Sequence, residues 1–214
     1  MNAMRIEALA RKTAVAIPSV CADCFKTDAL ISDDAQARSL AANRLGDVIV
    51  AAAAIGARTV LIPLLENASL RDDSARTNAA RGLESPLDIA ERCGVVLAVE
   101  SDLPARALSS WMRGLGHPSL GVYYDLGNAV ANGFSPPEEL PALIDLIRGV
   151  HVKDRRPSGG PNVPLGTGGV NFRAAFASLA SLGYDGPLIL ETVRTMNFFD
   201  EARRHHQFMR EHWP

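Results

Sequence analysis

The sequence predicts an α/β fold of the (β/α) TIM-barrel type that is incomplete, with about six strand–helix units. Two observations lead to this prediction. Short apolar runs alternate along the 214 residues with longer segments of helical patterning, and no linker or low-complexity tract divides them. Strands that alternate with helices lie parallel in one sheet. We therefore expect a single domain over residues 1–214.

Each expected strand is a run of apolar and β-branched residues bounded by polar or turn-forming residues. The six expected strands are 15–20, 59–64, 94–100, 120–125, 149–151 and 187–191.

The expected helices are supported by their apolar spacing and by capping residues. Asp102, Ser135 and Asn171 each stand where a polar side chain caps a helix. Gly82 and Pro86 predict an interruption of the third helix. The expected helices are 3–14, 36–56, 74–92, 103–115, 136–148, 172–182 and 199–211.

A closed barrel of this type needs eight strands and roughly 250 residues. The predicted domain is therefore short by two strands at its N-terminus. An open sheet edge exposes unpaired backbone groups, so a homo-oligomer that covers this edge is one expected partner arrangement.

Composition gives further expectations about location and partners. The net charge is -2 and the isoelectric point near 6.2, so no nucleic-acid or anionic membrane partner is expected. The longest apolar stretch, residues 48–57, is about half of what a membrane span requires. The first twenty residues lack the apolar core of a secretion signal, so we expect a cytoplasmic protein.

Four residues that can bind metal ions stand at or just past the ends of expected strands, namely Glu100, Asp125, His151 and Glu191. The carboxyl ends of parallel strands open on one face, so these side chains are expected to converge there. Three carboxylates and one imidazole suit one divalent ion, Mn²⁺, Mg²⁺, Co²⁺ or Zn²⁺.

Such a site suits proton abstraction next to a carbonyl, because a divalent cation stabilises the negative charge of an enediolate. Glu100 and Glu191 are the candidate acid/base pair, with Asp125 and His151 as anchors. Proton return to the opposite face would give epimerisation, and return to the neighbouring carbon would give aldose–ketose isomerisation.

Four segments resemble the xylose-isomerase-like TIM-barrel superfamily, and within it the sugar-phosphate isomerase/epimerase group. They are Tyr124-Asp-Leu-Gly-Asn128, His151-Val-Lys-Asp-Arg155, 163–172 and 183–191, and the resemblance is strongest over 94–194. Within this group, the sequence resembles the hexulose-6-phosphate and xylulose-5-phosphate 3-epimerases in particular. The resemblance implies a ketose or ketose phosphate as substrate, metal binding by the four residues named above, and acid/base catalysis by the two glutamates. It also implies that Lys153 lies near the substrate.

The glycine-rich stretch 159–169 has two interpretations. With Arg155 and Arg156 it could hold a phosphate through guanidinium and backbone N–H groups. Equally, its glycines could serve only to form tight turns in a flexible loop. We therefore take Lys153 and Arg155 as the candidate substrate-binding residues.

Three other functions are compatible with parts of this pattern. A truncated barrel could bind metal or sugar without catalysis, or need a partner chain. A dehydratase acting on an inositol-like ketone would use nearly the same site. A DNA-repair endonuclease of the same barrel type would need more metal ligands and a basic groove, and the sequence shows neither.

Overall fold

The computed structural model describes residues 3–192 and 196–214, so the last two residues of the resembling stretch, 193 and 194, lie outside the described residues. Six parallel strands form the main sheet of the described residues, in the order β1-β2-β3-β4-β5-β8. This confirms the α/β fold of an incomplete (β/α) barrel. The strands are β1 (Ser19–Cys21), β2 (Thr59–Leu64), β3 (Val96–Ser101), β4 (Leu120–Asp125), β5 (Ile147–Val152) and β8 (Leu188–Leu190).

The chain divides into two compact units, which are described one after the other. Unit 1 comprises Met1–Leu103 and Ser110–Val122, and unit 2 comprises Pro104–Ser109 and Tyr123–Pro214. Strand β4 and helix α4 (Ala105–Leu115) each contribute residues to both. The expectation of one domain over residues 1–214 stays a prediction.

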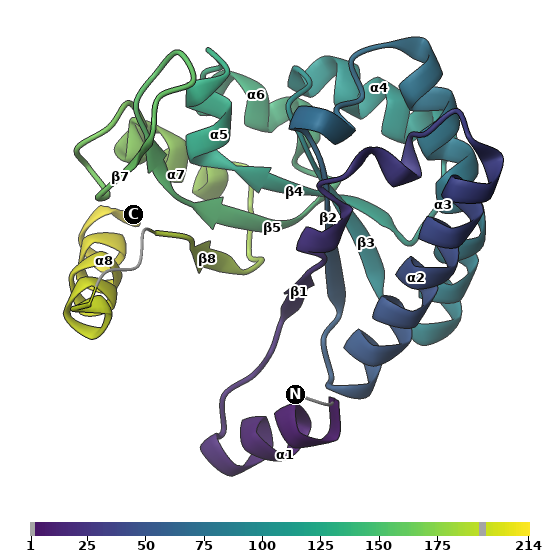
Figure 1. Ribbon diagram of the computed structural model, residues 1–214. Helices are drawn as coiled ribbons and strands as arrows, with labels where there is room; N and C mark the ends of the chain where they lie inside the picture. The colour runs from purple at the N-terminus through teal and green to yellow at the C-terminus, as the bar shows by residue number, and fades with distance from the viewer. Residues whose placement is uncertain (1–2, 193–195) are drawn as a thin grey trace. The chain divides into compact units, whose positions relative to one another are not determined.

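In unit 1, parallel strands are backed by two long helices that pack side by side, α2 (Ala35–Ala54) and α3 (Asp73–Cys93) (Figure 1). All six residues of β2 are buried, as its run of apolar residues predicts. Asp34 and Asp72 cap α2 and α3 by accepting backbone N–H groups at 2.8 Å. The helices are α1 (Ala3–Thr13), η1 (Asp23–Phe25), η2 (Asp28–Leu30), α2 (Ala35–Ala54), η3 (Glu66–Ala68) and α3 (Asp73–Cys93).

The predicted interruption of the third helix is wrong, because α3 runs through both Gly82 and Pro86. Gly82 lies close to η2, where an added Cβ would stand 3.0 Å from the carbonyl oxygen of Leu30. The glycine therefore serves close packing, and the proline costs one backbone hydrogen bond without ending the helix. The helix ends at Gly94, whose φ of 63° suits glycine.

Two further expectations in unit 1 are corrected. The first strand is shorter than 15–20, since only Ser19–Cys21 pairs with β2. Asp102 does not cap a helix from residue 103. Its carboxylate accepts from the Ser69 hydroxyl at 2.5 Å instead, and α4 begins at Ala105.

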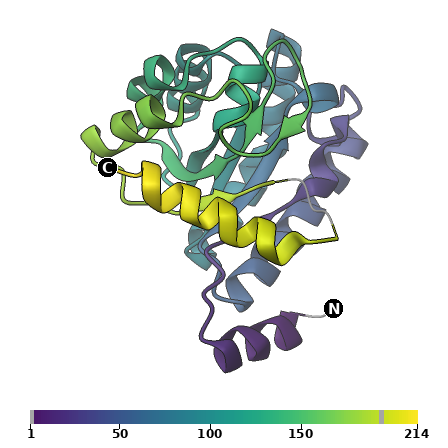
Figure 2. The same cartoon turned by 90° about the vertical axis from the view of Figure 1, so that its left-hand side faces the viewer.

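In unit 2, the C-terminal end of helix α8 (Phe198–His212) lies next to α7 (Phe172–Ser181), as the ribbons in Figure 2 show. Aromatic pairs contribute to this contact. Phe172 and Phe208 have ring centroids 5.2 Å apart, and Phe176 and Trp213 are 5.6 Å apart. The elements are α5 (Leu126–Ala131), α6 (Pro136–Leu143), β6 (Asp154–Arg155), β7 (Asn162–Val163), α7 (Phe172–Ser181) and α8 (Phe198–His212). Asn171 caps α7 as predicted.

The expected helix 136–148 is too long, because α6 ends at Leu143 and β5 begins at Ile147. Strand β5 pairs in parallel with β8, with Val150 opposite Leu188. Pairing within the sheet thus outweighs the helical spacing of the apolar residues around 144–147. Helix α5 and the antiparallel β6–β7 hairpin were not expected from the sequence.

Among residues 3–192 and 196–214, no helix combines the length and the apolar character that crossing a membrane demands.

Close packing of Tyr123 over Gly149 yields a prediction about stability. A Cβ at position 149 would lie 2.4 Å from the Tyr123 ring. We expect Gly149→Ala to lower the free energy of unfolding by about 1–3 kcal/mol through overpacking. Urea denaturation measures this. Gly114→Ala is the control, because nothing lies within 4 Å of its added Cβ. Equal stability of the two variants would contradict the packing argument.

Candidate metal and substrate site

The turn between β4 and α5 fixes the position of the Asp125 carboxylate. Asp125 is the N-cap of α5, and its Oδ1 accepts the Asn128 backbone N–H at 2.7 Å. Gly127 allows this short helix to approach Lys153, because an added Cβ would stand 3.0 Å from the Lys153 carbonyl oxygen and side chain. The segment Asp125-Leu-Gly-Asn128 therefore folds as a cap with a close-packed glycine.

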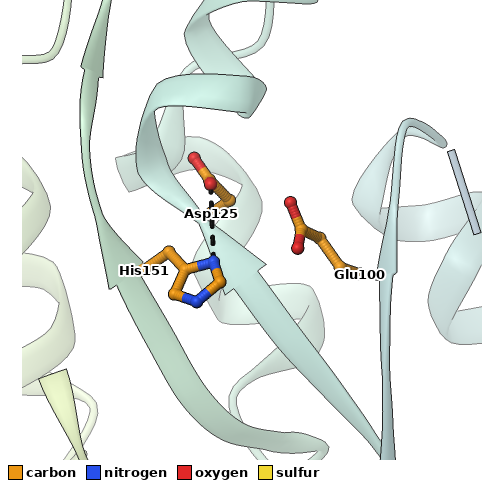
Figure 3. A group of neighbouring side chains, drawn as sticks. All are labelled: Glu100, Asp125 and His151. Carbon is orange, nitrogen blue, oxygen red and sulfur yellow. Dashed lines mark ion pairs between the residues drawn. The ribbon is translucent and has the colours of Figure 1, made fainter. Parts of the chain in front are cut away.

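The second oxygen of Asp125 faces two cationic or potentially cationic groups. Its Oδ2 lies 3.1 Å from the Lys153 ammonium nitrogen and 3.6 Å from His151 Nδ1, the pair that the dashed line marks in Figure 3. Glu191, just past β8, completes the group. Its Oε1 lies 3.0 Å from Lys153 Nζ, and its Oε2 lies 2.9 Å from His151 Nδ1. Three of the four predicted ligands and Lys153 thus meet in unit 2.

The electrostatics of this cluster favour charged carboxylates. The His151 imidazole is the main reason why the pKa of Glu191 falls from 4.5 to about 2, and the Lys153 ammonium adds to the effect while burial opposes it. For Lys153, burial alone would lower the pKa. The carboxylates of Asp125 and Glu191 outweigh burial, so the pKa of Lys153 is raised.

The separations of the two carboxylates from the His151 imidazole suit ligands that share one divalent ion. Ligand atoms at about 2.1 Å from one ion are roughly 3.0–3.4 Å apart in octahedral or tetrahedral geometry. The separations from His151 Nδ1 to the two carboxylates, 2.9 and 3.6 Å, bracket that range. Carboxylate oxygens with one imidazole suit the first-row divalent ions and Mg²⁺.

Glu100, the fourth predicted ligand, belongs to unit 1. It stands near the carboxyl end of β3, opposite Pro63 of β2, and is 6% exposed. Figure 3 also draws this side chain. A glutamate this deeply buried is unusual unless a cation or hydrogen-bond donors compensate its charge.

Arg155 lies in the β6–β7 hairpin. Its guanidinium donates to the Asn128 side-chain oxygen at 2.9 Å, to the Gly160 carbonyl at 3.0 Å and to the Gly159 carbonyl at 3.4 Å. The contact with Asn128 ties the hairpin to α5, and the two carbonyl contacts lie within the hairpin's own loop. The substrate-binding roles of Arg155 and Lys153 stay predictions.

Asp154 organises the glycine-rich loop, a role that the sequence analysis missed. This carboxylate is 1% exposed and accepts the backbone N–H groups of Gly166, Gly168 and Val170 at 2.9, 2.8 and 3.1 Å. The sequence feature that could have indicated this role is an aspartate next to Lys153, followed by a glycine-rich stretch. Only glycine fits at 168, since an added Cβ would lie 2.2 Å from Asp154 Oδ1.

The backbone donors of the loop are engaged within the protein, which favours the turn-forming interpretation over phosphate binding by backbone N–H groups. Besides the three that Asp154 accepts, Gly159 donates to Ala131 at 2.8 Å and Gly169 to Arg155 at 2.9 Å. A phosphate held by this backbone would have to replace these bonds.

The fold agrees with the comparisons with known proteins. The chain matches the family described as xylose isomerase-like TIM barrel over residues 2–212, and it belongs to that family. Over 186 residues it is 33% identical to L-ribulose-5-phosphate 3-epimerase UlaE of Salmonella paratyphi C, and 32% identical to the protein of that name from Salmonella typhi. The matched stretch is 84% of this chain and 66% of each relative, just under two thirds of their length.

Solved structures show the same fold at low sequence identity. A xylose isomerase domain protein from Planctomyces limnophilus superposes with a TM-score of 0.82 at 19% identity, covering 98% of this chain and 80% of that one. A D-tagatose 3-epimerase-like protein gives 0.82 at 20% identity, covering 98% and 82%.

We expect Asp154→Asn to lower the free energy of unfolding by about 1–3 kcal/mol. Both carboxylate oxygens of Asp154 accept backbone N–H groups, whereas the asparagine side chain has only one oxygen that can accept. Urea denaturation measures the change. Asp200→Asn is the matched control, since Asp200 pairs with Arg203 on the exposed face of α8. A loss no larger than that of the control would contradict the role of Asp154.

The lowered pKa of Glu191 predicts pH-dependent stability in EDTA. The charged form is favoured by folding, so its contribution is fully present above about pH 5 and is lost as the pH falls towards 2. We expect the difference in unfolding free energy between wild type and Glu191→Gln to shrink over that window. Because the side chain is 45% exposed, solvent screening keeps this contribution modest. A difference that is constant from pH 6 to 3 would contradict the assignment.

Proposed function

We propose that this chain is a divalent-metal-dependent epimerase or isomerase of a ketose or ketose phosphate. The observation that carries the proposal is the cluster of Asp125, His151, Lys153 and Glu191 in unit 2. The relatives named as L-ribulose-5-phosphate 3-epimerases favour epimerisation of a phosphorylated ketose over aldose–ketose isomerisation.

Asp125, His151, Glu191 and Glu100 would hold the ion. Their side chains are of the kinds that hold a divalent metal, and the first two and Glu100 are buried. Strand order supports including Glu100. Within unit 1, Val99 of β3 stands opposite Val122 of β4 in parallel register, and β4 continues to Asp125.

The bound cation would stabilise negative charge on the enediolate oxygens. Glu191 is the candidate for proton transfer, because its side chain is 45% exposed and a substrate can therefore reach its carboxylate. Glu100 is the second acid/base group. For epimerisation the two carboxylates must address opposite faces of the same carbon, one removing the proton and the other returning it.

Lys153 supplies a positive donor beside these carboxylates. With its ammonium nitrogen about 3 Å from both Asp125 and Glu191, it stands where it could donate to a substrate hydroxyl or oxyanion. A homo-oligomer that covers the sheet edge, the partner arrangement expected from the sequence, stays a prediction.

Calorimetry and isotope exchange test the proposed function. We expect purified protein to bind one Mn²⁺ or Co²⁺ per chain, and Asp125→Asn to lower that affinity at least about tenfold. Asp200→Asn is the control.

With metal present, L-ribulose 5-phosphate or another ketose phosphate in D₂O should gain carbon-bound deuterium, which NMR measures.

In Glu191→Gln the exchange rate should fall by about 10²–10⁴, the usual contribution of a general acid or base. Metal binding without exchange on any ketose phosphate would leave a binding-only protein. Absence of metal binding would remove the metal-dependent mechanism.

A further inference from the structure

Lys153 contacts the oxygens that the proposed function assigns to the metal. Its ammonium nitrogen lies 3.1 Å from Asp125 Oδ2 and 3.0 Å from Glu191 Oε1. The same Asp125 oxygen and the other Glu191 oxygen face His151 Nδ1. One ammonium group thus contacts two of the carboxylates that would hold a divalent ion.

The position of this lysine is built into the fold. Lys153 is 7% exposed, and the aliphatic part of its side chain packs against α5, where the absence of a side chain at Gly127 leaves room for the Lys153 Cγ. Parallel pairing fixes the chain on either side of the contact, since the Glu191 backbone N–H donates to the Val152 carbonyl at 3.1 Å. Lys153 is therefore a buried counter-ion with a fixed stem, in contrast to a mobile surface charge.

A divalent ion and an ammonium group cannot share these oxygens without strong repulsion. Like charges a few ångströms apart in a buried site repel strongly, because little water is present to screen them. Without any cation, two carboxylates that both lie about 3 Å from the same nitrogen would also repel each other. The site therefore needs positive charge at all times.

We infer that the Lys153 ammonium is a built-in competitor of the divalent ion. It holds the Asp125 and Glu191 carboxylates together in the metal-free protein and is displaced when the ion binds. Lys153 thereby sets the affinity of the site for metal. Displacement also frees a positively charged donor for a substrate oxygen, so metal loading prepares substrate binding. This inference rests on the proposed function.

The first test is metal affinity, measured by calorimetric titration of Mn²⁺ at constant pH. Lys153→Met should bind Mn²⁺ at least about tenfold more tightly than wild type, because the competing charge is gone. Lys153→Gln, which is neutral but polar, should also bind more tightly and serves if the Met variant folds poorly. Arg156→Met is the matched control. It removes an exposed positive charge three residues away and should change the affinity less than twofold.

The second test uses wild-type protein. The chain has three lysines, Lys12, Lys26 and Lys153, and the first two are exposed. Acetylation with a limiting amine reagent, read by mass spectrometry, should modify Lys153 faster when Mn²⁺ is present than in EDTA. Lys12 is the internal control whose rate should not change. Lys26 is not used as a control, because the charge of Glu100, a proposed ligand, acts on it.

The outcomes separate the inference from the proposed function. Equal Mn²⁺ affinity of wild type and both Lys153 variants, with unchanged labelling of Lys153, would overturn the inference alone. Weaker binding by the variants would also overturn it, because Lys153 would then support the ligands. Absence of Mn²⁺ binding by wild type and variants together would overturn the proposed function itself.

Discussion

Asp125 and Glu191 reach the same ammonium group from the ends of strands that lie on either side of β5. Gathering carboxylates in a poorly hydrated place is costly unless a cation accompanies them. The local structure meets this constraint with the Lys153 ammonium and the His151 imidazole, both held on the chain of β5 or just past it. The cap at α5 and the close approach at Gly127 keep these groups in place.

In the extended backbone at the end of β5, successive side chains point to opposite sides, and the two sides have different roles. His151 and Lys153, two residues apart, both contact the carboxylates. Asp154, the next residue, instead accepts three backbone N–H groups of the glycine-rich loop. One short segment therefore supplies the charges of the candidate site and anchors the loop beside it. This explains why the chain places a lysine and an aspartate next to each other.

Much of the architecture could be predicted from the sequence, because apolar runs of strand length are local signals. All six expected strands appear in the sheet, although the first is shorter and β5 starts earlier. The errors arose where long-range contacts decide. Helix α3 continues through Gly82, which packs closely against the Leu30 carbonyl of η2, and α6 stops where strand pairing with β8 takes over. The β6–β7 hairpin depends on Arg155 and Asp154, whose partners lie elsewhere in the chain.

The order of strands and helices, the residue types at the strand ends and hence the family are properties of the sequence itself. They follow from local patterning and the direction of parallel strands. Only the tertiary structure decided which charges meet: Lys153 bridges Asp125 and Glu191, and the loop N–H groups bind Asp154. Side-chain contacts between distant segments depend on distances of an ångström or less, which no local pattern of residues specifies.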